Sequence, residues 1–183
     1  MSEDKSMRIR RVVTGQAKDG ASVLANETSV APVETALLPG VKFYSLWGAD
    51  AAVSLPNDGA EPEFRTWFPP DGGFRFELIV LPPDGTPPAP GLNLAQALAE
   101  TEKLLPGLIG KMDPAHPGMH QTDSVDLIYV TTGACMLELD GGREIALKTG
   151  DVVVQNGPRH AWHNPHEEPC GLLTISLGVD RKG

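Results

Sequence analysis

The sequence lacks the features of several common protein classes. Of its 183 residues only two are cysteines, Cys135 and Cys170, which share no CxxC spacing and predict no disulfide framework. We expect both to be small buried thiols. No apolar run is long enough to span a membrane, and the charged segment 1–11 lacks the apolar core of a signal peptide. These absences predict a cytoplasmic protein without a membrane partner.

Basic charge is also scarce, with 15 lysines and arginines against 24 aspartates and glutamates and a net charge of −9. Nucleic acids and anionic membranes both require a basic face, so we expect no nucleic-acid partner. The sequence contains no GxSxG elbow, no phosphate-binding P-loop and no GxGxxG after a strand. The acidic balance is interpreted as a source of solubility.

Glycine and proline are abundant, with 20 and 17 residues. This composition favours short strands joined by tight turns. The C-terminal part predicts a regular meander, with strands at 126–132, 134–139, 143–147, 152–155, 160–163 and 172–177. Such a series is typical of an all-β sandwich or closed barrel, and the absence of an internal repeat predicts one copy of it.

The N-terminal part predicts strands at 9–13, 22–25 and 41–47, and a hairpin whose arms are 64–68 and 74–81. A helix is expected at 93–105, where Asn93 can act as the N-cap, and we interpret it as a lid or brace. The segment 113–178 is too short to close a barrel alone. We therefore expect a single domain, 1–183, in which the N-terminal extension 1–112 adds strands to a barrel core at 113–178.

Histidines are few and clustered. None occurs in the first 115 residues, whereas His116, His120, His160, His163 and His166 lie within about fifty residues of one another. Clustered imidazoles are typical of metal sites, although they occur elsewhere too.

Two segments resemble the paired motifs of the cupin family. The first cupin motif reads His-x-His, three or four residues, Glu, six residues, Gly, and it matches His120, Thr122, Asp126 and Gly133. The second reads Gly, five residues, Pro-x-Gly, two residues, His, three residues, Asn. Its end matches Gly157, His160 and Asn164, whereas Gln155 replaces the proline.

The resemblance implies an all-β cupin fold, a jelly-roll or double-stranded β-helix barrel, with one or two short helices. It also implies a divalent transition metal inside the barrel, such as iron, manganese, nickel or zinc. Because Thr122 replaces one histidine and Asp126 the glutamate, the remaining ligand set is His120, Asp126 and His160. Two histidines and one carboxylate form the facial triad of non-haem iron enzymes. The alternative is a site that has lost its metal.

Three further residues are candidates for the ligand pocket. Thr122 shares a strand face with His120, and Trp162 lies two residues after His160, so both should point inward. Trp162 could instead only pack in the core. Arg75 and Glu77 share one face of the strand 74–81. Arg75 could bind a ligand carboxylate if that face lines the barrel, or the pair could face solvent. Tyr129 is out of register with Asp126 and should point outward.

Two functions remain open. One is a metal-dependent enzyme acting on a small organic molecule, as a dioxygenase, isomerase, decarboxylase or cyclase, with no catalytic residue assigned. The other is a small-ligand-binding cupin without metal or catalysis. Open strand edges invite pairing, so we also expect a homodimer.

Overall fold

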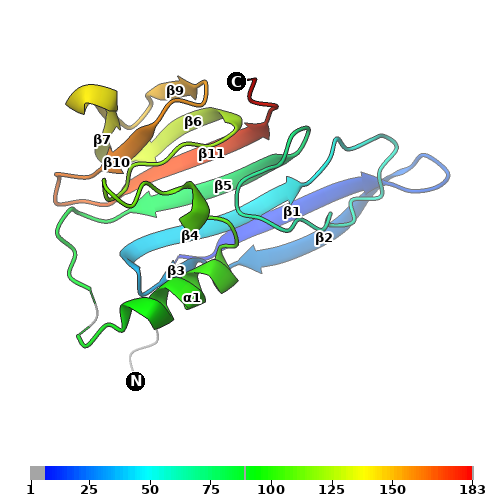
Figure 1. The fold of residues 1–183 in the computed structure, drawn as a ribbon. Helices are drawn as coiled ribbons and strands as arrows, with labels where there is room; N and C mark the ends of the chain where they lie inside the picture. The colour runs from blue at the N-terminus through cyan, green and yellow to red at the C-terminus, as the bar shows by residue number, and fades with distance from the viewer. Residues whose placement is uncertain (1–6, 89, 183) are drawn as a thin grey trace.

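The computed structural model describes residues 7–88 and 90–182, and strands dominate this part of the chain (Figure 1). The elements in chain order are β1 (Ile9–Gln16), β2 (Ser22–Val30), β3 (Val33–Thr35), β4 (Leu38–Ala49), β5 (Phe74–Leu81), α1 (Leu94–Leu104), η1 (Ile109–Lys111), β6 (Ser124–Thr132), β7 (Ala134–Leu139), η2 (Asp140–Gly142), β8 (Arg143–Lys148), β9 (Val152–Gln155), β10 (His160–His163) and β11 (Cys170–Gly178). The strand at 74–81 and those at 134–139, 152–155 and 160–163 have the predicted bounds.

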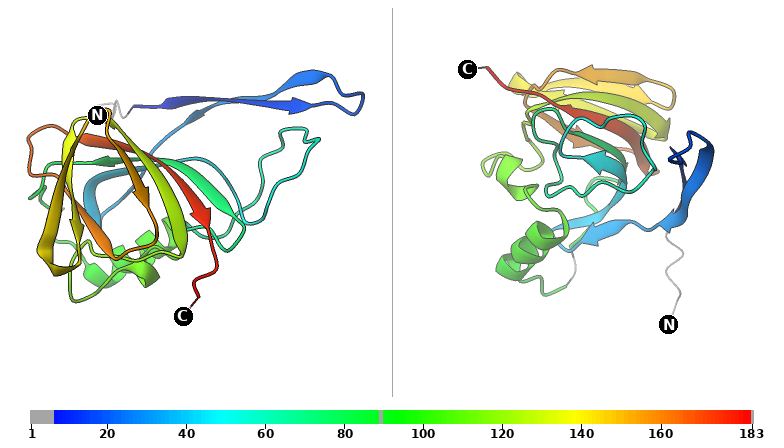
Figure 2. Two further views of the ribbon diagram at one scale, coloured as in Figure 1. Left: turned by 90° about the horizontal axis from the view of Figure 1, so that it is seen from above. Right: turned by 90° about the vertical axis from the view of Figure 1, so that its right-hand side faces the viewer.

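The strands form two facing sheets and a separate ribbon. The larger sheet has the order β3-β4-β5-β11-β6-β9, and the smaller has the order β10-β7-β8. Figure 2 shows the two sheets curving around a shared interior. The ladders do not run continuously around this interior, so the molecule is a jelly-roll of two sheets and not one closed barrel. The predicted all-β jelly-roll is confirmed.

Strands from the N-terminal half complete the larger sheet, as predicted. β5 pairs with β11 over its full length, from Phe74 opposite Leu177 to Leu81 opposite Cys170, and β4 pairs with the other side of β5. The segment that carries the cupin motifs therefore depends on β4 and β5 to cover one side of its interior.

The larger sheet alternates between buried polar and exposed apolar side chains. Asp126, Ser176 and Glu77 are buried on the inner face, whereas Leu127 and Ile175 are exposed on the outer face. Successive residues of a strand point to opposite faces, and the paired register places Asp126 directly opposite Ser176. The interior of this domain is therefore unusually polar, and Tyr129 points outward as predicted.

The predicted strand at 64–68 is wrong, because this segment is an irregular loop. Both edges of β5 are already occupied by β4 and β11, so no ladder position is left for a hairpin partner. Trp67 instead packs into a core cluster with Phe43, Leu105 and Leu108, and its backbone N–H donates to the carbonyl of Pro106 at 2.7 Å.

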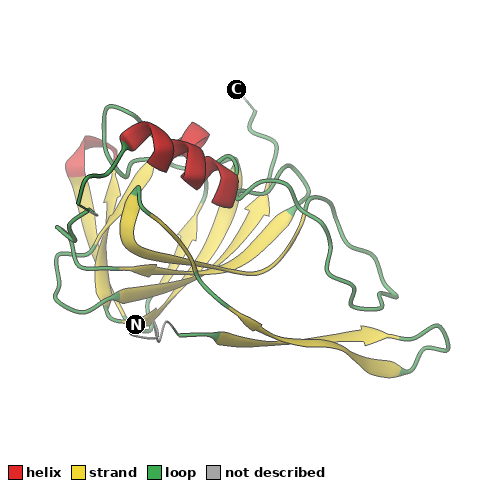
Figure 3. Ribbon diagram, turned by 90° about the horizontal axis from the view of Figure 1, so that it is seen from below, coloured by secondary structure: helices red, strands yellow, loops and turns green. Residues whose placement is uncertain are grey.

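The helix is confirmed, with α1 beginning one residue after its predicted cap. The backbone N–H of Gln96 donates to Asn93 Oδ1 at 3.1 Å. Figure 3 shows α1 lying across the strands on one side of the molecule, and Ala97 and Thr101 are its buried residues. The helix braces the end of the sheet near β3.

The first two strands stand apart from the body. β1 and β2 form a two-stranded antiparallel ribbon that pairs with no other strand in residues 7–88 and 90–182, and Figure 2 shows it projecting beyond the sheets. Within the described residues, no helix is both long and apolar enough to cross a membrane.

Candidate functional site

His120 and His160 lie opposite each other and are joined through their backbones. The N–H of His120 donates to the carbonyl of His160 at 2.9 Å, and the N–H of His160 donates to the carbonyl of His120 at 3.0 Å. Opposed residues in an antiparallel pair point to the same face. The two imidazole rings accordingly lie with their centroids 4.1 Å apart. The two motifs are thus brought together as predicted.

Backbone carbonyls fix the orientation of both rings. His120 Nδ1 lies 2.9 Å from the carbonyl of Gly118, and His160 Nδ1 lies 3.1 Å from the carbonyl of Pro158. A carbonyl can only accept, so each Nδ1 carries the proton and each Nε2 of the neutral ring holds a lone pair. His160 Nε2 is 2.8 Å from the amide nitrogen of Gln155, which donates to it.

Burial keeps both imidazoles neutral. Desolvation lowers the pKa of His120, against the opposing effects of the Gly118 carbonyl and the Asp126 charge. Desolvation, together with the neighbouring His120, lowers the pKa of His160 to about 4. Near neutral pH the site therefore presents uncharged bases.

Asp126 lies on the same interior, on β6. Burial raises the pKa of this carboxyl, whereas the neighbouring hydroxyls of Ser124 and Ser176 and the charge of His120 lower it. Its Oδ1 atom is buried and has no hydrogen-bond partner among the described residues, and such an atom is costly to leave unpaired. The opposite residue in the ladder, Gln155, has an equally unpaired Oε1.

The donor types of this interior suit a divalent transition metal, because two imidazoles and a carboxylate are its usual ligands. Their placement does not complete the expected set. No group of three or more His, Cys, Asp or Glu side chains in the described part of the chain is positioned to hold a metal ion.

Of the predicted pocket residues, Thr122 and Trp162 lie at this interior. Thr122 is buried and its hydroxyl accepts a hydrogen bond from Ser124 at 2.8 Å. The Trp162 ring stands edge-on to His160 with centroids 6.0 Å apart, and it also packs against the core of the smaller sheet. Core packing of Trp162 is therefore observed, and its role in a ligand pocket stays a prediction.

Arg75 has a different role from the predicted one. It is buried, with 1% of its surface exposed, so neither a solvated face nor a free ligand-binding guanidinium describes it. Its nitrogens donate to Asp50 Oδ1 at 2.6 Å and to the carbonyls of Ala49, Thr66 and Phe74. Arg75 ties the loop after β4 to β5 and has no donor set aside for a ligand.

Three residues at the interior were not among the predicted site residues, although Glu77 was expected to share a strand face with Arg75. Phe68 stacks on His120 with centroids 6.3 Å apart, Gln155 holds His160, and Glu77 is a fully buried carboxyl. The replacement of the motif proline by Gln155 and the alternation of Arg75 with Glu77 were visible in the sequence. Phe68 gave no signal, because its loop reaches the site only through tertiary packing.

Glu77 is expected to make stability depend on pH. Burial raises its pKa well above 4.5, Arg75 lowers it and Asp126 raises it further. The folded protein thus holds a proton that the unfolded chain releases, so this contribution to stability is full below pH 4.5 and is lost as pH rises toward the folded pKa.

The substitution Glu77→Gln should therefore raise the free energy of unfolding at pH 8, because it removes the carboxyl whose ionisation is disfavoured by burial. It should change stability little at pH 4. Urea denaturation across this range measures both. The exposed Glu100→Gln is the control, and equal curves for the two variants would contradict the prediction.

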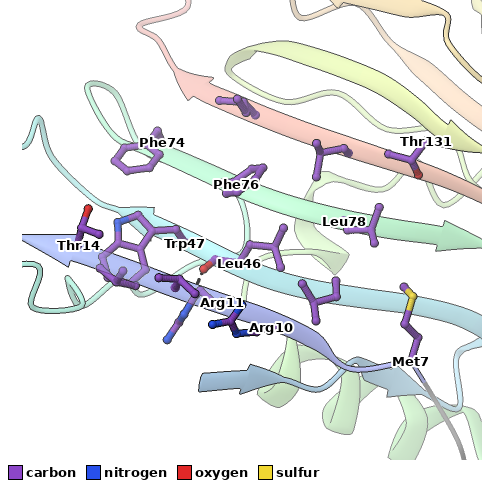
Figure 4. Close-up of a pocket in the computed structure, with 15 residues that line it drawn as sticks. Met7, Arg10, Arg11, Thr14, Leu46, Trp47, Phe74, Phe76, Leu78 and Thr131 are labelled. Atoms are coloured by element: carbon purple, nitrogen blue, oxygen red, sulfur yellow. Dashed lines mark hydrogen bonds between the residues drawn. The ribbon is translucent and has the colours of Figure 1, made fainter. Parts of the chain in front are cut away.

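One surface pocket lies next to a neighbour of the histidine pair. It has a volume of about 440 Å³ and includes Phe68, Lys111 and Arg181, and Phe68 stacks on His120. A larger pocket, about 860 Å³, lies on the outer face of the larger sheet and contains neither histidine (Figure 4). Pocket volume alone therefore does not identify the part of the molecule that carries the histidine pair.

Comparison with known proteins agrees with the motif reading. Residues 108–176 match the family model described as "Cupin domain". Among curated proteins, the Oryzines biosynthesis cluster protein J of Aspergillus oryzae is 44% identical over 54 residues, which cover 27% of this chain and 30% of that protein. The Phomopsin biosynthesis cluster protein C' of Diaporthe leptostromiformis is 48% identical over 57 residues, covering 31% and 30%.

The chain thus spans about a third of the length of these curated relatives. Among solved structures, the cupin domain of Schizosaccharomyces pombe Cnp3 is similar, with a TM-score of 0.46 and 11% identity, over 94% of this chain and 89% of that one. The family match covers both motifs, from before His120 to the end of β11. Residues 108–176 are therefore a cupin domain.

Proposed function

We propose that the interior around His120 and His160 binds a small organic molecule and transfers protons on it. The observation that carries this proposal is the pair of opposed imidazoles, 4.1 Å apart, whose Nδ1 protons are held by backbone carbonyls. A general base must be unprotonated at working pH and must be aimed at its substrate. His120 meets the first condition, and its Nε2 has no hydrogen-bond partner among the described residues.

His160 is the second histidine of the pair, and we do not assign it as the base. Its Nε2 is already engaged by the Gln155 amide, so the free acceptor of the pair is His120 Nε2, the base that we assign. Trp162 and Phe68 supply aromatic surface beside the two rings, which suits an apolar or planar ligand. Of the reaction types that the cupin resemblance implies, isomerisation and cyclisation proceed by such proton transfers.

The names of the relatives support a place in small-molecule biosynthesis. Both matched proteins are named for biosynthesis clusters, and an enzyme of such a cluster acts on an organic intermediate. The sequence identity with these relatives covers less than a third of this chain. We therefore propose no narrower substrate class than an organic molecule with an acidic C–H bond.

The test follows deuterium incorporation from D₂O at the α-carbon of small ketones and β-keto esters by NMR. We expect wild-type protein to accelerate exchange, and His120→Gln to lose about 100-fold or more of that acceleration. His166→Gln, on the exposed loop after β10, is the control and should retain the activity. A ligand that binds without exchange would identify the chain as a binding protein, against this proposal.

The protonation states are tested without any substrate. Imidazole ¹⁵N shifts should show both rings neutral with the proton on Nδ1 at pH 7, and His160 should titrate near pH 4. A proton on either Nε2 at pH 7 would remove the free base and contradict the mechanism.

One observation favours a second candidate, a divalent transition metal such as iron, manganese, nickel or zinc. The unpaired Oδ1 of Asp126 is an acceptor for which the described residues supply no donor, and a cation would satisfy it. His120, His160 and Asp126 would have to move closer together to hold the ion, because no group of three such side chains in the described part of the chain is placed for one. An ion held there would polarise bound oxygen atoms as a Lewis acid.

Metal analysis of protein purified without a polyhistidine tag separates the two candidates. A stoichiometric transition metal that is lost in both His160→Ala and Asp126→Asn, but retained in His166→Ala, would establish the metal site. Retention of the metal in Asp126→Asn would show that the unpaired oxygen is not a ligand.

A further inference from the structure

The short tail after β11 returns to the segment that carries the first histidine motif. The backbone N–H of Val179 donates to the carbonyl of Asp123 at 3.0 Å, which places the tail beside the start of β6 (Figure 1). The Arg181 side chain reaches the same segment. Its Nε donates to Asp123 Oδ1 at 2.5 Å, and its Nη2 donates to the carbonyl of Thr122 at 2.6 Å. Thr122 is only two residues after His120.

The same nitrogen of Arg181 also contacts the second motif. Nη2 donates to the carbonyl of Gly157 at 3.0 Å, and Gln121 Nε2 donates to that carbonyl at the same distance. Gly157 has φ +63°, and a Cβ on it would lie 2.8 Å from Arg181 Nη2. The motif glycine therefore leaves the space that the guanidinium occupies. Arg181 thus links the segment that follows His120 to the segment that leads into His160.

The two carbonyl contacts decide the strength of this link. The ion pair between Arg181 and Asp123 is open to water, with 41% and 44% of the side chains exposed, and exposed pairs contribute little to stability. Hydrogen bonds from a charged donor to partly buried carbonyls are stronger. Nη2 carries two hydrogens, one for the carbonyl of Thr122 and one for that of Gly157. Loss of the guanidinium would therefore release both segments at once.

The pairing of the two histidines depends on such a restraint. His120 meets His160 in an isolated bridge outside the ladders of the two sheets. An isolated bridge opens more readily than a ladder, because few neighbouring hydrogen bonds must break with it. A displacement of about 1 Å at a catalytic group can cost about 100-fold in rate. A contact that holds both chain segments beside the bridge therefore bears directly on the chemistry of the pair.

We propose that Arg181 is a positioning residue for the histidine pair, which holds the segments 120–123 and 157–160 together and thereby keeps the two imidazoles opposed. Its effect on catalysis rests on the proposed proton transfer, whereas its effect on the bridge does not. Arg181 lies beyond the matched cupin segment, which ends at residue 176. The geometry of the pair thus depends on a residue outside that segment.

Amide hydrogen exchange measured by NMR tests the positioning without any substrate. In Arg181→Met we expect the amide protons of His120 and His160 to exchange at least about tenfold faster than in the wild type, because the bridge opens more often. Amide protons in the ladder between β5 and β11 should exchange as before, which a general loss of stability would not allow. Lys182→Met is the matched control, because it removes the same charge from the neighbouring exposed residue, and it should leave both sets of amide protons unchanged.

Activity is the second measurement. Arg181→Met should lose about 10- to 100-fold of the wild-type acceleration of deuterium exchange, through a lower kcat with KM little changed. Lys182→Met should retain the activity of the wild type.

The amide protons decide the role of Arg181. Unchanged exchange at His120 and His160 in Arg181→Met would overturn the positioning role, and so would an equal acceleration in the β5–β11 ladder. A wild type that leaves the substrate protons in place would refute the proton transfer alone, because the amide measurement still decides whether Arg181 holds the pair.

Discussion

The substitution Arg75→Met should lower the free energy of unfolding by about 3–5 kcal/mol, the range measured when one member of a buried ion pair is removed. Methionine has a similar volume, so little cavity results. The loss comes from the carbonyls of Ala49, Thr66 and Phe74, which lose their donor, and from Asp50, which loses its counter-ion. Each buried acceptor left unpaired costs about 1–3 kcal/mol.

Urea denaturation monitored by tryptophan fluorescence measures this loss. Arg65→Met is the matched control, because Arg65 lies next to Thr66 in the loop before β5 and its side chain is exposed. Its effect should stay within about 0.5 kcal/mol. An Arg75→Met variant as stable as that control would show that the buried guanidinium network contributes nothing net to folding.

The substitution Gly133→Ala should cost about 3 kcal/mol, although it adds only one methyl group. Gly133 has φ +69°, and a Cβ there would lie 2.4 Å from the carbonyl oxygen of Pro169. The positive φ strains any side chain, and the contact forces the chain before β11 away from the turn between β6 and β7.

Gly141→Ala separates the two contributions. Gly141 has nearly the same backbone conformation, φ +76°, but nothing lies within 4 Å of its added Cβ. This control should cost about 1 kcal/mol from backbone strain alone, and thermal unfolding of the two variants compares them directly. Equal losses would mean that the Pro169 contact relaxes freely and that the motif glycine is needed only for its turn.

Local sequence patterns predicted much of the fold, because the strands of the C-terminal meander are short and are separated by turn residues. Glycine turns and two-residue alternation gave β7, β9 and β10 with their bounds, and Asn93 marked the start of α1. The predicted strand at 64–68 failed because strand formation depends on a free neighbouring edge, and β5 has none. A hairpin signal in the sequence carries no information about which edges the rest of the chain occupies.

The site was predictable to the extent that it follows from the paired motifs. The motif spacing correctly predicted that His120 and His160 lie close together, because the two residues occupy opposed positions in an antiparallel pair. The role of Arg75 depends on Asp50 and on the carbonyls of Ala49 and Thr66, which are far from it in sequence. The periodicity of a strand gives no information about such contacts. The same holds for Phe68, which reaches His120 from an irregular loop.

The reciprocal backbone hydrogen bonds between residues 120 and 160 have a consequence for how this domain can change over evolution. They depend on main-chain atoms, so any residue other than proline at either position preserves them. The scaffold thereby holds two opposed side chains at a fixed separation whatever their chemistry. New reactivity can arise at these two positions by single substitutions, without any adjustment of the surrounding architecture.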